Sequence, residues 1–483
     1  MNLCELTIKQ AQEGLAKKKF SSLELTQSCL ERIRRLDKKI KAFITVCGDK
    51  ALVQAEKADK KMGDLRDLGD MRELFVRYPL LGIPIALKDL YAASGIKTTA
   101  GSKVLENYIG QYDGTVVKRL KEAGAIIIGK TNCDAWAHGS SGENSDFGPT
   151  RNPWDLEKTP GGSSSGSAAA VSVGECLAST GTDTGGSIRL PASFCNMVGL
   201  KPTYGRVPRY GVVAMASSLD SMGHFTKTVY DSALVLKATA GKDFFDATSS
   251  SLPVGDYPKN IDRGVRGIKI GIPKEYFIEG VDTRILKKVK EAIKKLEALG
   301  AKTLGISLPH AEYAMAVYYI IQPAEVSSNL GRYDGIRFGN ARETFGDEAK
   351  RRIMLGTYTL SAGYYEAYYL KAMKVRTLIK KDFEEAFKKV EVIIAPTSPS
   401  LAWKLGEKVD DPLKMYLSDI FTVTANLAGI PGLAIPCGFV DSSTSLLPVG
   451  MQILGPHFSE GMLFQVGYAY EQATQWYKIK PKL

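Results

Sequence analysis

Histidine is scarce in this chain of 483 residues, and its four occurrences lie far apart: His138, His224, His310 and His457. Few residues could therefore act as the histidine base that activates the serine of a Ser-His hydrolase. Cysteine is also infrequent, with seven residues and no spacing typical of metal ligands: Cys4, Cys29, Cys47, Cys133, Cys176, Cys195 and Cys437. Their odd number and scattered positions predict reduced thiols in an intracellular chain without a bound metal.

Long apolar runs are absent as well, since no stretch approaches the ~20 residues of a membrane-spanning helix. The first residues, 1–5, lack the basic flank and the apolar core of a signal peptide. We also expect no P-loop, the glycine-rich motif that binds nucleotide phosphates. These absences predict a soluble, cytoplasmic protein that has no membrane partner and binds no cofactor of its own.

The net charge of +12 is the difference between 64 Lys and Arg residues and 52 Asp and Glu residues. An excess of this size is compatible with a polyanionic partner such as RNA. Lysine-rich helix faces that are simply solvated explain the same excess, and we regard them as the simpler interpretation. The hydrophobic share of 44% and the charged share of 24% are those of an ordinary globular chain.

The alternation of short apolar runs with glycine predicts an α/β fold. The region of about 1–65 is expected to be helical, since Ser21 and Glu24 form a capping box ahead of apolar residues at helical spacing. The region of about 80–235 is the expected catalytic core. No repeat or linker interrupts the chain, so we predict one domain over 1–483. The expected elements are strands at 81–87, 125–129, 303–307 and 392–396, and helices at 115–123, 164–173 and 284–299.

Three short segments carry residues suited to acyl transfer. Ser187 follows the run Thr184-Gly185-Gly186, and glycines permit a tight turn whose N–H groups can bind an oxyanion. Lys88 ends a buried apolar run, where loss of water lowers the pKa of an amine and makes it a base. Ser163, at the start of a helix, either passes a proton between them or caps the helix. Singly, each has a structural alternative: a flexible glycine loop, a surface lysine, a helix cap.

The serine-rich segment also has a second interpretation, the nucleophile elbow. Residues 162–166 match G-x-S-x-G with Ser164 as the nucleophile. An elbow requires a strand directly before it, and the prolines at 151–160 are incompatible with a central strand. We therefore favour Ser187 over Ser164 as the nucleophile.

The sequence resembles the amidase signature family. The likeness rests on GGSSSGSAAAV at 161–171, DTGGSIRLP at 183–191 and GLKPTYGRV at 199–207. The order Lys88, Ser163, Ser187 is similar to the family's Lys–cis-Ser–Ser triad. The likeness extends over nearly the whole chain and is greatest to the family's glutamine-hydrolysing subunits of tRNA-dependent amidotransferases, through 144–154, 327–335, 350–356 and 426–432.

This resemblance implies a fold and a set of roles. The fold would be a single large domain with a central mixed β-sheet covered by helices on both faces. Ser187 would be the acyl-enzyme nucleophile, Ser163 a relay that follows a cis peptide bond, and Lys88 the final base. The backbone of Thr184, Gly185 and Gly186 would bind the oxyanion. We further expect Asp183 and Arg189, which flank this turn with opposite charges, to brace it.

The same resemblance implies a pocket for glutamine. Glutamine is a zwitterion, so a selective site needs a cation for the α-carboxylate and an anion for the α-ammonium. Arg352 and Asp419 match the family's positions for these roles, and Tyr318 matches an aromatic contact. The neighbours Arg351 and Tyr319 are alternatives to two of them. A surface arginine and a helix-capping aspartate are the structural alternatives.

The implied activity is glutamine hydrolysis, with ammonia passed to a partner subunit for transamidation of Glu-tRNA(Gln), Asp-tRNA(Asn) or both. The partners would be a B subunit and a small C subunit in a heterotrimer, with ATP and Mg²⁺ used by the complex rather than by this chain. A stand-alone amidase of small or aryl amides is the alternative enzyme. An RNA-binding module with an inactive site is the non-enzymatic alternative.

Four positions depart from the pattern of those subunits: Ala135, His138, Gly142 and Leu190. The pattern has Glu, Met and Thr at the first three and glutamine at the fourth. The segment between 339 and 350 is also shorter than the resemblance implies. None of these touches the expected triad, so they bear on the shape of the pocket and on partner contacts. His138 either lines the pocket or packs in the core.

Overall fold

The computed structural model contains a β-sheet, to which both the N-terminal and the C-terminal parts of the chain contribute strands. It describes residues 2–66, 71–336, 339–442 and 445–483. Within these residues the sheet has eleven strands. Their spatial order is β1 (Phe43–Val46), β3 (Ile126–Thr131), β2 (Pro84–Lys88), β4 (Ala178–Asp183), β6 (Ser221–Thr226), β5 (Val198–Lys201), β10 (Gly432–Asp441), β11 (Leu446–Leu454), β9 (Val392–Pro396), β7 (Lys269–Pro273) and β8 (Lys302–Ile306).

The sheet is mixed, as predicted. β2 runs parallel to both of its neighbours, β3 and β4, and β7 runs parallel to β8 and β9. The remaining pairs are antiparallel, and the longest is β10 with β11. Every residue of β2, β3 and β4 is buried, because helices or loops cover both faces of these strands.

Helices pack on both faces of the sheet. In β10, Leu433 lies against Gly467 of α15 (Glu460–Thr474), whereas the preceding residue, Gly432, faces Arg189 of α7 (Arg189–Phe194). Successive strand residues point to opposite faces, so these two helices lie on opposite sides. On the side of α15, contacts continue through α8 (Val229–Thr239) to α5 (Thr115–Glu122) and through α9 (Thr283–Ala298). On the side of α7 lies α6 (Ser165–Val173).

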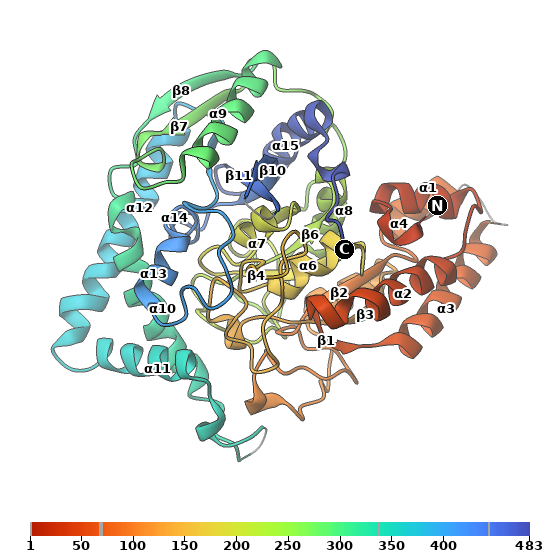
Figure 1. Cartoon of the computed structure of the whole chain (residues 1–483), viewed down its shortest axis with the longest axis horizontal. Coiled ribbons are helices and arrows are strands. Elements are labelled where there is room, and N and C mark those ends of the chain that lie inside the picture. Colours follow the sequence, from red (N-terminus) through yellow and green to blue (C-terminus); the bar gives the residue numbers. More distant parts are fainter. Residues whose placement is uncertain (1, 67–70, 337–338, 443–444) are drawn as a thin grey trace.

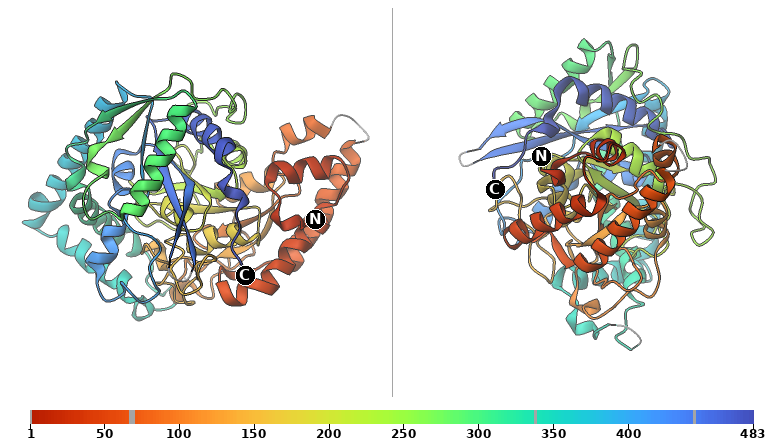
Figure 2. Two further views of the ribbon diagram at one scale, coloured as in Figure 1. Left: turned by 45° about the horizontal axis from the view of Figure 1, so that its top comes forward. Right: turned by 90° about the vertical axis from the view of Figure 1, so that its right-hand side faces the viewer.

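The N-terminal region forms a helical layer beside β1–β3 (red in Figures 1 and 2). The capping box is confirmed, because Ser21 and Glu24 exchange side-chain and backbone hydrogen bonds of 3.0 and 2.7 Å. Residue 1 of the predicted helical region lies outside the described residues. The helices are α1 (Ile8–Ala16), α2 (Ser22–Ile40), α3 (Gly48–Arg66) and α4 (Met71–Arg77).

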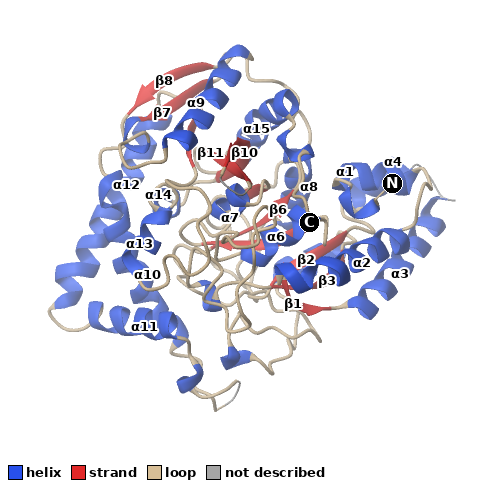
Figure 3. Ribbon diagram, in the orientation of Figure 1, coloured by secondary structure: helices blue, strands red, loops and turns tan. Residues whose placement is uncertain are grey.

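A second helical group lies across the sheet from the N-terminal layer (cyan and blue in Figure 1). Its members are α10 (Ala314–Leu330), α11 (Asp347–Thr359), α12 (Lys371–Phe387), α13 (Pro412–Tyr416) and α14 (Val423–Ala428), with a π-helical turn at Tyr365–Leu370. α10 contacts α11, α12 and α14. Between the two groups, Figure 3 shows long loops gathered beside β4 and α6.

The predicted elements are present with shifts of a few residues at their ends. The strand at 392–396 matches β9, and the helix at 284–299 matches α9 within one residue. The strand expected at 81–87 instead begins at Pro84, because Gly82 adopts a φ of +75° in the preceding turn. We predict a single domain over 1–483, and a single domain requires that strands from all regions join one sheet. The described strands do so.

Within the described parts of the chain, no helix combines the length and apolar character needed to cross a membrane.

Candidate active site

Lys88 is the last residue of β2, and its side chain is fully buried among hydroxyl groups. Its Nζ donates hydrogen bonds to Ser163 Oγ at 2.8 Å, Ser164 Oγ at 2.9 Å and Thr182 Oγ1 at 2.8 Å. The parallel neighbour β4 supplies Thr182, and Thr180 of the same strand accepts from the Lys88 backbone N–H at 2.9 Å. The alternative of a surface lysine is therefore wrong.

The environment of Lys88 favours the neutral amine. Burial lowers its pKa to about 8, because the ammonium loses its hydration, and Cys133, Asp134 and Asp183 offset this only in part. No carboxylate forms an ion pair with the amine among the residues that the structure describes. Its three direct partners are hydroxyls, which can accept from an ammonium and also donate to a neutral amine.

Ser163 follows a cis peptide bond with Gly162. It does not cap α6, because Ser164 holds the N-cap position and neither serine makes a capping hydrogen bond; the cap interpretation is wrong. The elbow interpretation also lacks its strand, since 151–160 contains only turns and isolated bridges.

The turn after β4 presents unpaired backbone donors. Among the described residues, the N–H groups of Thr184, Gly185 and Gly186 have no acceptor. A Cβ on Gly185 would lie 2.7 Å from Tyr318 Oη, and one on Gly186 would collide with Thr422, so both positions require glycine. The turn is buried and packed rather than a flexible loop. Successive free N–H groups of this kind are suited to bind an oxyanion.

Ser187 ends this turn, ahead of α7. Its side chain is 8% exposed, and its hydroxyl has no hydrogen-bond partner in the described part of the chain. The backbone N–H of Ser164 donates to the Ser187 carbonyl at 3.3 Å. The structure thus brings the segments of Lys88, Ser163 and Ser187 together, as the sequence analysis expected.

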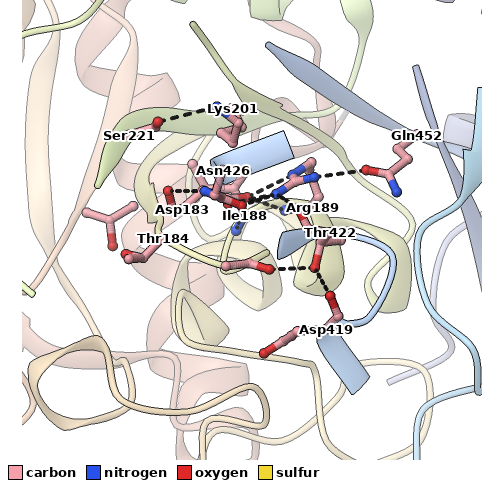
Figure 4. Close-up of polar contacts among 12 residues, drawn as sticks. Asp183, Thr184, Ile188, Arg189, Lys201, Ser221, Asp419, Thr422, Asn426 and Gln452 are labelled. Carbon is pink, nitrogen blue, oxygen red and sulfur yellow. Dashed lines mark hydrogen bonds and ion pairs between the residues drawn. The ribbon is translucent and has the colours of Figure 1, made fainter. Parts of the chain in front are cut away.

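The turn is held by an ion pair between Asp183 and Arg189, both fully buried (Figure 4). Arg189 Nε and Nη2 donate to the two carboxylate oxygens at 3.1 and 3.0 Å. Further contacts come from Asn426, which donates to the Asp183 carboxylate at 2.9 Å, and Gln452, which accepts from Arg189 at 2.9 Å. Burial raises the pKa of Asp183, but Arg189, together with Lys201 and Asn426, outweighs this effect, and the pKa is lowered to about 2. The expected brace is present.

Asp419 is linked to the turn through Thr422 (Figure 4). The Thr422 hydroxyl lies 2.5 Å from the Gly185 carbonyl oxygen and 3.0 Å from that of Asp419. The Asp419 carboxylate accepts from Ser140 Oγ at 2.6 Å and caps no helix. Burial raises its pKa to about 7, and the Ser140 hydrogen bond and the charge of Arg352 offset part of this effect.

Arg352 is 3% exposed, so the alternative of a surface arginine is wrong for it. Its Nε donates to Glu348 at 2.7 Å and its Nη1 to Gln322 at 2.7 Å. Its guanidinium also lies over the rings of Tyr319 and Tyr416, with carbon-to-centroid distances of 5.4 and 5.3 Å.

The structure distinguishes the neighbouring candidates. Arg351 is 43% exposed at its side chain, whereas Arg352 is buried. Tyr318 is buried against Gly185, whereas Tyr319 stacks on Tyr416 with ring centroids 3.9 Å apart. Arg352 is therefore more buried than Arg351, and Tyr318 is more buried than Tyr319.

Several site residues were missed by the sequence analysis. Gln322 lies four residues after Tyr318 on α10, and Glu348 four residues before Arg352 on α11. This spacing places each pair on one helix face and was available in the sequence. Thr182 and Ser140 carry no such signal, because their contacts depend on strand pairing and on residues far along the chain.

We expected no P-loop, but one segment that matches the motif was overlooked. The segment 124–131, GAIIIGKT, has the spacing of a P-loop. It forms β3 rather than a loop, however, and its Lys130 is buried in an ion pair with Asp89 at 3.0 Å. A strand with its lysine so engaged cannot cradle phosphates.

The departures from the family pattern lie close to this site. Gly142 has a φ of +82° and donates its N–H to Asp134 at 2.9 Å, and a Cβ there would lie 2.5 Å from Ser165. Leu190 packs in an apolar cluster with Phe194 and Trp403.

Among the described residues, no group of His, Cys, Asp and Glu is arranged to hold a metal ion, and the seven cysteines are free and buried.

Residues 24–464 match the family model described as Amidase. A relative from Carboxydothermus hydrogenoformans, named as the A subunit of glutamyl-tRNA(Gln) amidotransferase, is 52% identical over 498 aligned residues, covering 100% of both chains. A relative of the same name from Geobacter metallireducens is 52% identical and covers 99% of each chain. The crystal structure of the A subunit of glutamyl-tRNA(Gln) amidotransferase from Thermotoga maritima has a TM-score of 0.81 at 45% identity, covering 98% of this chain and 95% of that one.

Replacing Arg189 by Met is expected to lower the free energy of unfolding by about 3–5 kcal/mol, because Asp183 would be left as an unpaired buried charge. The exposed pair Lys237–Asp256 provides the control, since Lys237→Met should change the same quantity by less than about 1 kcal/mol. Urea unfolding followed by fluorescence measures both. Equal midpoints for the two variants would contradict the bracing role.

Proposed function

Because this chain belongs to the amidase family, we propose that it hydrolyses glutamine through Ser187, Ser163 and Lys88 and delivers ammonia to a partner subunit. The observation that carries the proposal is the contact of the buried Lys88 amine with Ser163, beside the free N–H groups of the turn that ends at Ser187. The full-length similarity to glutamyl-tRNA(Gln) amidotransferase A subunits supports glutamine as the amide.

In the proposed first step, the Ser187 oxygen attacks the side-chain amide carbon of glutamine. The Ser187 proton passes to Ser163 as the Ser163 proton passes to the neutral Lys88 amine. The carbonyl oxygen becomes an oxyanion, and the N–H groups of Thr184, Gly185 and Gly186 stabilise it without rearranging. Pre-arranged donors of this kind typically contribute the largest part of such catalysis.

In the second step the proton returns from Lys88 through Ser163 to the leaving nitrogen. The carbon–nitrogen bond breaks, ammonia leaves, and a γ-glutamyl ester remains on Ser187. Water then attacks this ester with the same groups acting as base and acid, which releases glutamate and restores Ser187. Ammonia and glutamate are the two products.

Selectivity for glutamine is proposed to come from opposite charges in the second half of the site. Arg352 would bind the α-carboxylate and Asp419 the α-ammonium, with Tyr318 lining the space beside Gly185. A stand-alone amidase of small or aryl amides, the alternative, has no use for this charged pair. Arg352 is already paired with Glu348, and Asp419 accepts from Ser140, so the charged ends of the substrate would add to these contacts rather than supply the first partners.

Ammonia is proposed to serve transamidation of a mischarged tRNA in a cytoplasmic complex with a B subunit and a small C subunit. In that assignment ATP and Mg²⁺ belong to the complex, since the one P-loop-like segment of this chain is a buried strand. Whether Glu-tRNA(Gln) or Asp-tRNA(Asn) is amidated depends on the subunit that reads the tRNA.

An exposed apolar surface on α11 and the following π-helical turn is the proposed docking site for the partner subunit. We call it the α11 surface; it consists of Met354, Leu355, Tyr358, Tyr364, Tyr365 and Tyr368. Met354 is 72% exposed, and Tyr364 contacts Tyr358 in a tilted arrangement and stacks on Tyr368, with ring centroids 4.2 and 5.8 Å apart. Contiguous exposed apolar side chains rich in aromatics are typical of protein interfaces.

An electrophilic glutamine analogue, such as a diazoketone, is expected to label Ser187, as detected by mass spectrometry of the complex with its partner subunits. Ser187→Ala and Lys88→Met should each lower glutamine turnover by at least about a thousandfold, because each removes a member of the proton-transfer chain. Ser164→Ala should cost only about fivefold, the loss of one hydrogen bond to Lys88. Label on Ser164, or full turnover by Ser187→Ala, would overturn the assignment.

The value of kcat/KM for glutamine is expected to rise with pH until about 8. Lys88 accepts a proton only when neutral, and its pKa is about 8, so kcat/KM should fall about tenfold per pH unit below that value. Below about pH 7 the fall should steepen, because protonation of Asp419 removes the anion that binds the α-ammonium. Measuring kcat/KM between about pH 6 and pH 9 tests both the fall below pH 8 and the steeper fall below pH 7. An apparent pKa near that of an exposed lysine would contradict the role of Lys88.

Introducing charge on the α11 surface through Tyr358→Glu and Tyr368→Glu is expected to weaken binding of the partner subunits at least about tenfold, because a carboxylate would lose hydration in the interface. Co-purification and titration of the assembled complex measure this change. Phe244→Glu is the matched control, since Phe244 is 95% exposed on a separate loop. Equal binding by both variants would contradict the docking site.

A further inference from the structure

The loop 138–140 contacts one of the two charged groups of the site directly. At one end, the Ser140 hydroxyl donates to the Asp419 carboxylate at 2.6 Å. Two residues earlier in the chain lies His138, which is 1% exposed. Burial, and then Arg352, hold the pKa of His138 well below its usual range, so its imidazole is neutral.

The imidazole of His138 has no hydrogen-bond partner among the described residues, at either ring nitrogen, although it is only 1% exposed. Buried polar atoms are almost always paired, and leaving one unpaired costs about 1–3 kcal/mol. His224, the other fully buried histidine, follows the rule, since its Nε2 lies 2.8 Å from Ser232 Oγ. Of these two buried histidines, His138 is the one without a partner in the part of the chain that the structure describes.

Gln322 shows the same feature beside the same cation. Its Oε1 accepts from Arg352 Nη1 at 2.7 Å, which fixes the orientation of the amide. Its Nε2 has no partner in the described part of the chain, although the residue is fully buried. Within the described chain, two buried groups thus have unpaired N–H donors: Gln322, which contacts Arg352, and His138, whose pKa the charge of Arg352 helps to lower.

We propose that His138 and Gln322 determine specificity by donating hydrogen bonds to the α-carboxylate of the substrate, beside Arg352. A carboxylate has two oxygens that accept several hydrogen bonds, whereas an ammonium has no acceptor. A neutral imidazole adds a donor without adding a second positive charge next to Arg352. The inference rests on the proposed function, and it deepens it by naming further groups that recognise the amino-acid end of the substrate.

This arrangement makes the site discriminate against amides that lack a carboxylate. Without that group, the N–H donors of His138 and Gln322 would remain unpaired in the complex. Sites built to hydrogen-bond one substrate group reject the analogue that lacks it by far more than an apolar pocket does. Small aliphatic and aryl amides are accordingly poor substrates in this scheme.

The test compares two substrates in the complex with its partner subunits: L-glutamine, and L-glutamine α-amide, in which a carboxamide replaces the α-carboxylate. His138→Ala is expected to raise KM for glutamine by about 10–100-fold, since a hydrogen bond to a charged group contributes about 1.5–3 kcal/mol, with kcat nearly unchanged. KM for the α-amide should change less than about threefold. Gln322→Leu should behave in the same way, and His138→Asn, which retains a donor, should recover part of the loss.

His457→Ala is the control for loss of a histidine, because His457 is exposed and lies by Gly429. Thermal unfolding of each variant verifies folding, and glutamine binding to the double variant Ser187→Ala/His138→Ala, against Ser187→Ala alone, gives a second measurement that needs no turnover. Equal effects on both substrates, or none on glutamine, would overturn the inference and leave the proposed function intact. No glutamine turnover by the wild-type complex would overturn both.

Discussion

The buried ion pair between Asp183 and Arg189 is the interaction on which the arrangement of the site depends. Through Arg189 it joins the end of β4 to α7, α14 and β11, and it thereby fixes both ends of the turn that carries Thr184, Gly185 and Gly186. A buried pair stabilises little relative to apolar packing, but losing one partner is costly. Its value here lies in the single geometry that it enforces on three unpaired N–H groups.

Two buried cations of the site have different partners. Arg189 is surrounded by a carboxylate and several other oxygens. Lys88, buried to the same extent, has only hydroxyl groups as direct partners, and the pKa of its amine falls to about 8. The proposed base and the proposed brace therefore differ not in depth but in the absence or presence of a neighbouring anion.

Much of the fold follows from local signals in the sequence. The apolar run at 392–396 and the capping box at Ser21 were predicted because strands and helix starts carry their information within a few residues. The spacing of 124–131 shows the limit of such signals, since a P-loop pattern there is a buried strand. The apolar run at 125–129 predicted a strand there, but the pairing of that strand, β3, with β1 and β2 is contained in no short motif.

The site was predictable to the extent that its residues stand in recognisable segments. Lys88, Ser163 and Ser187 could be named, and the structure brings their segments together. The contact of Ser140 with Asp419 spans 279 residues of sequence and becomes visible only in three dimensions. The unpaired nitrogens of His138 and Gln322 were likewise invisible, because satisfaction of a hydrogen bond is a property of packing and not of residue type.

The parallel pairing of β2 with β4 also constrains how these strands can align. Thr180 and Thr182 lie on the same face of β4, where one accepts from the Lys88 backbone and the other from its amine. A slip of one residue would turn both hydroxyls away and bring Gly181 or Asp183 toward Lys88. The slipped sheet would bury an amine with no hydroxyl from β4, at a large cost in free energy. Lys88 thus favours a single register of β2 against β4, so the group proposed to act as the base also contributes to the specificity of folding.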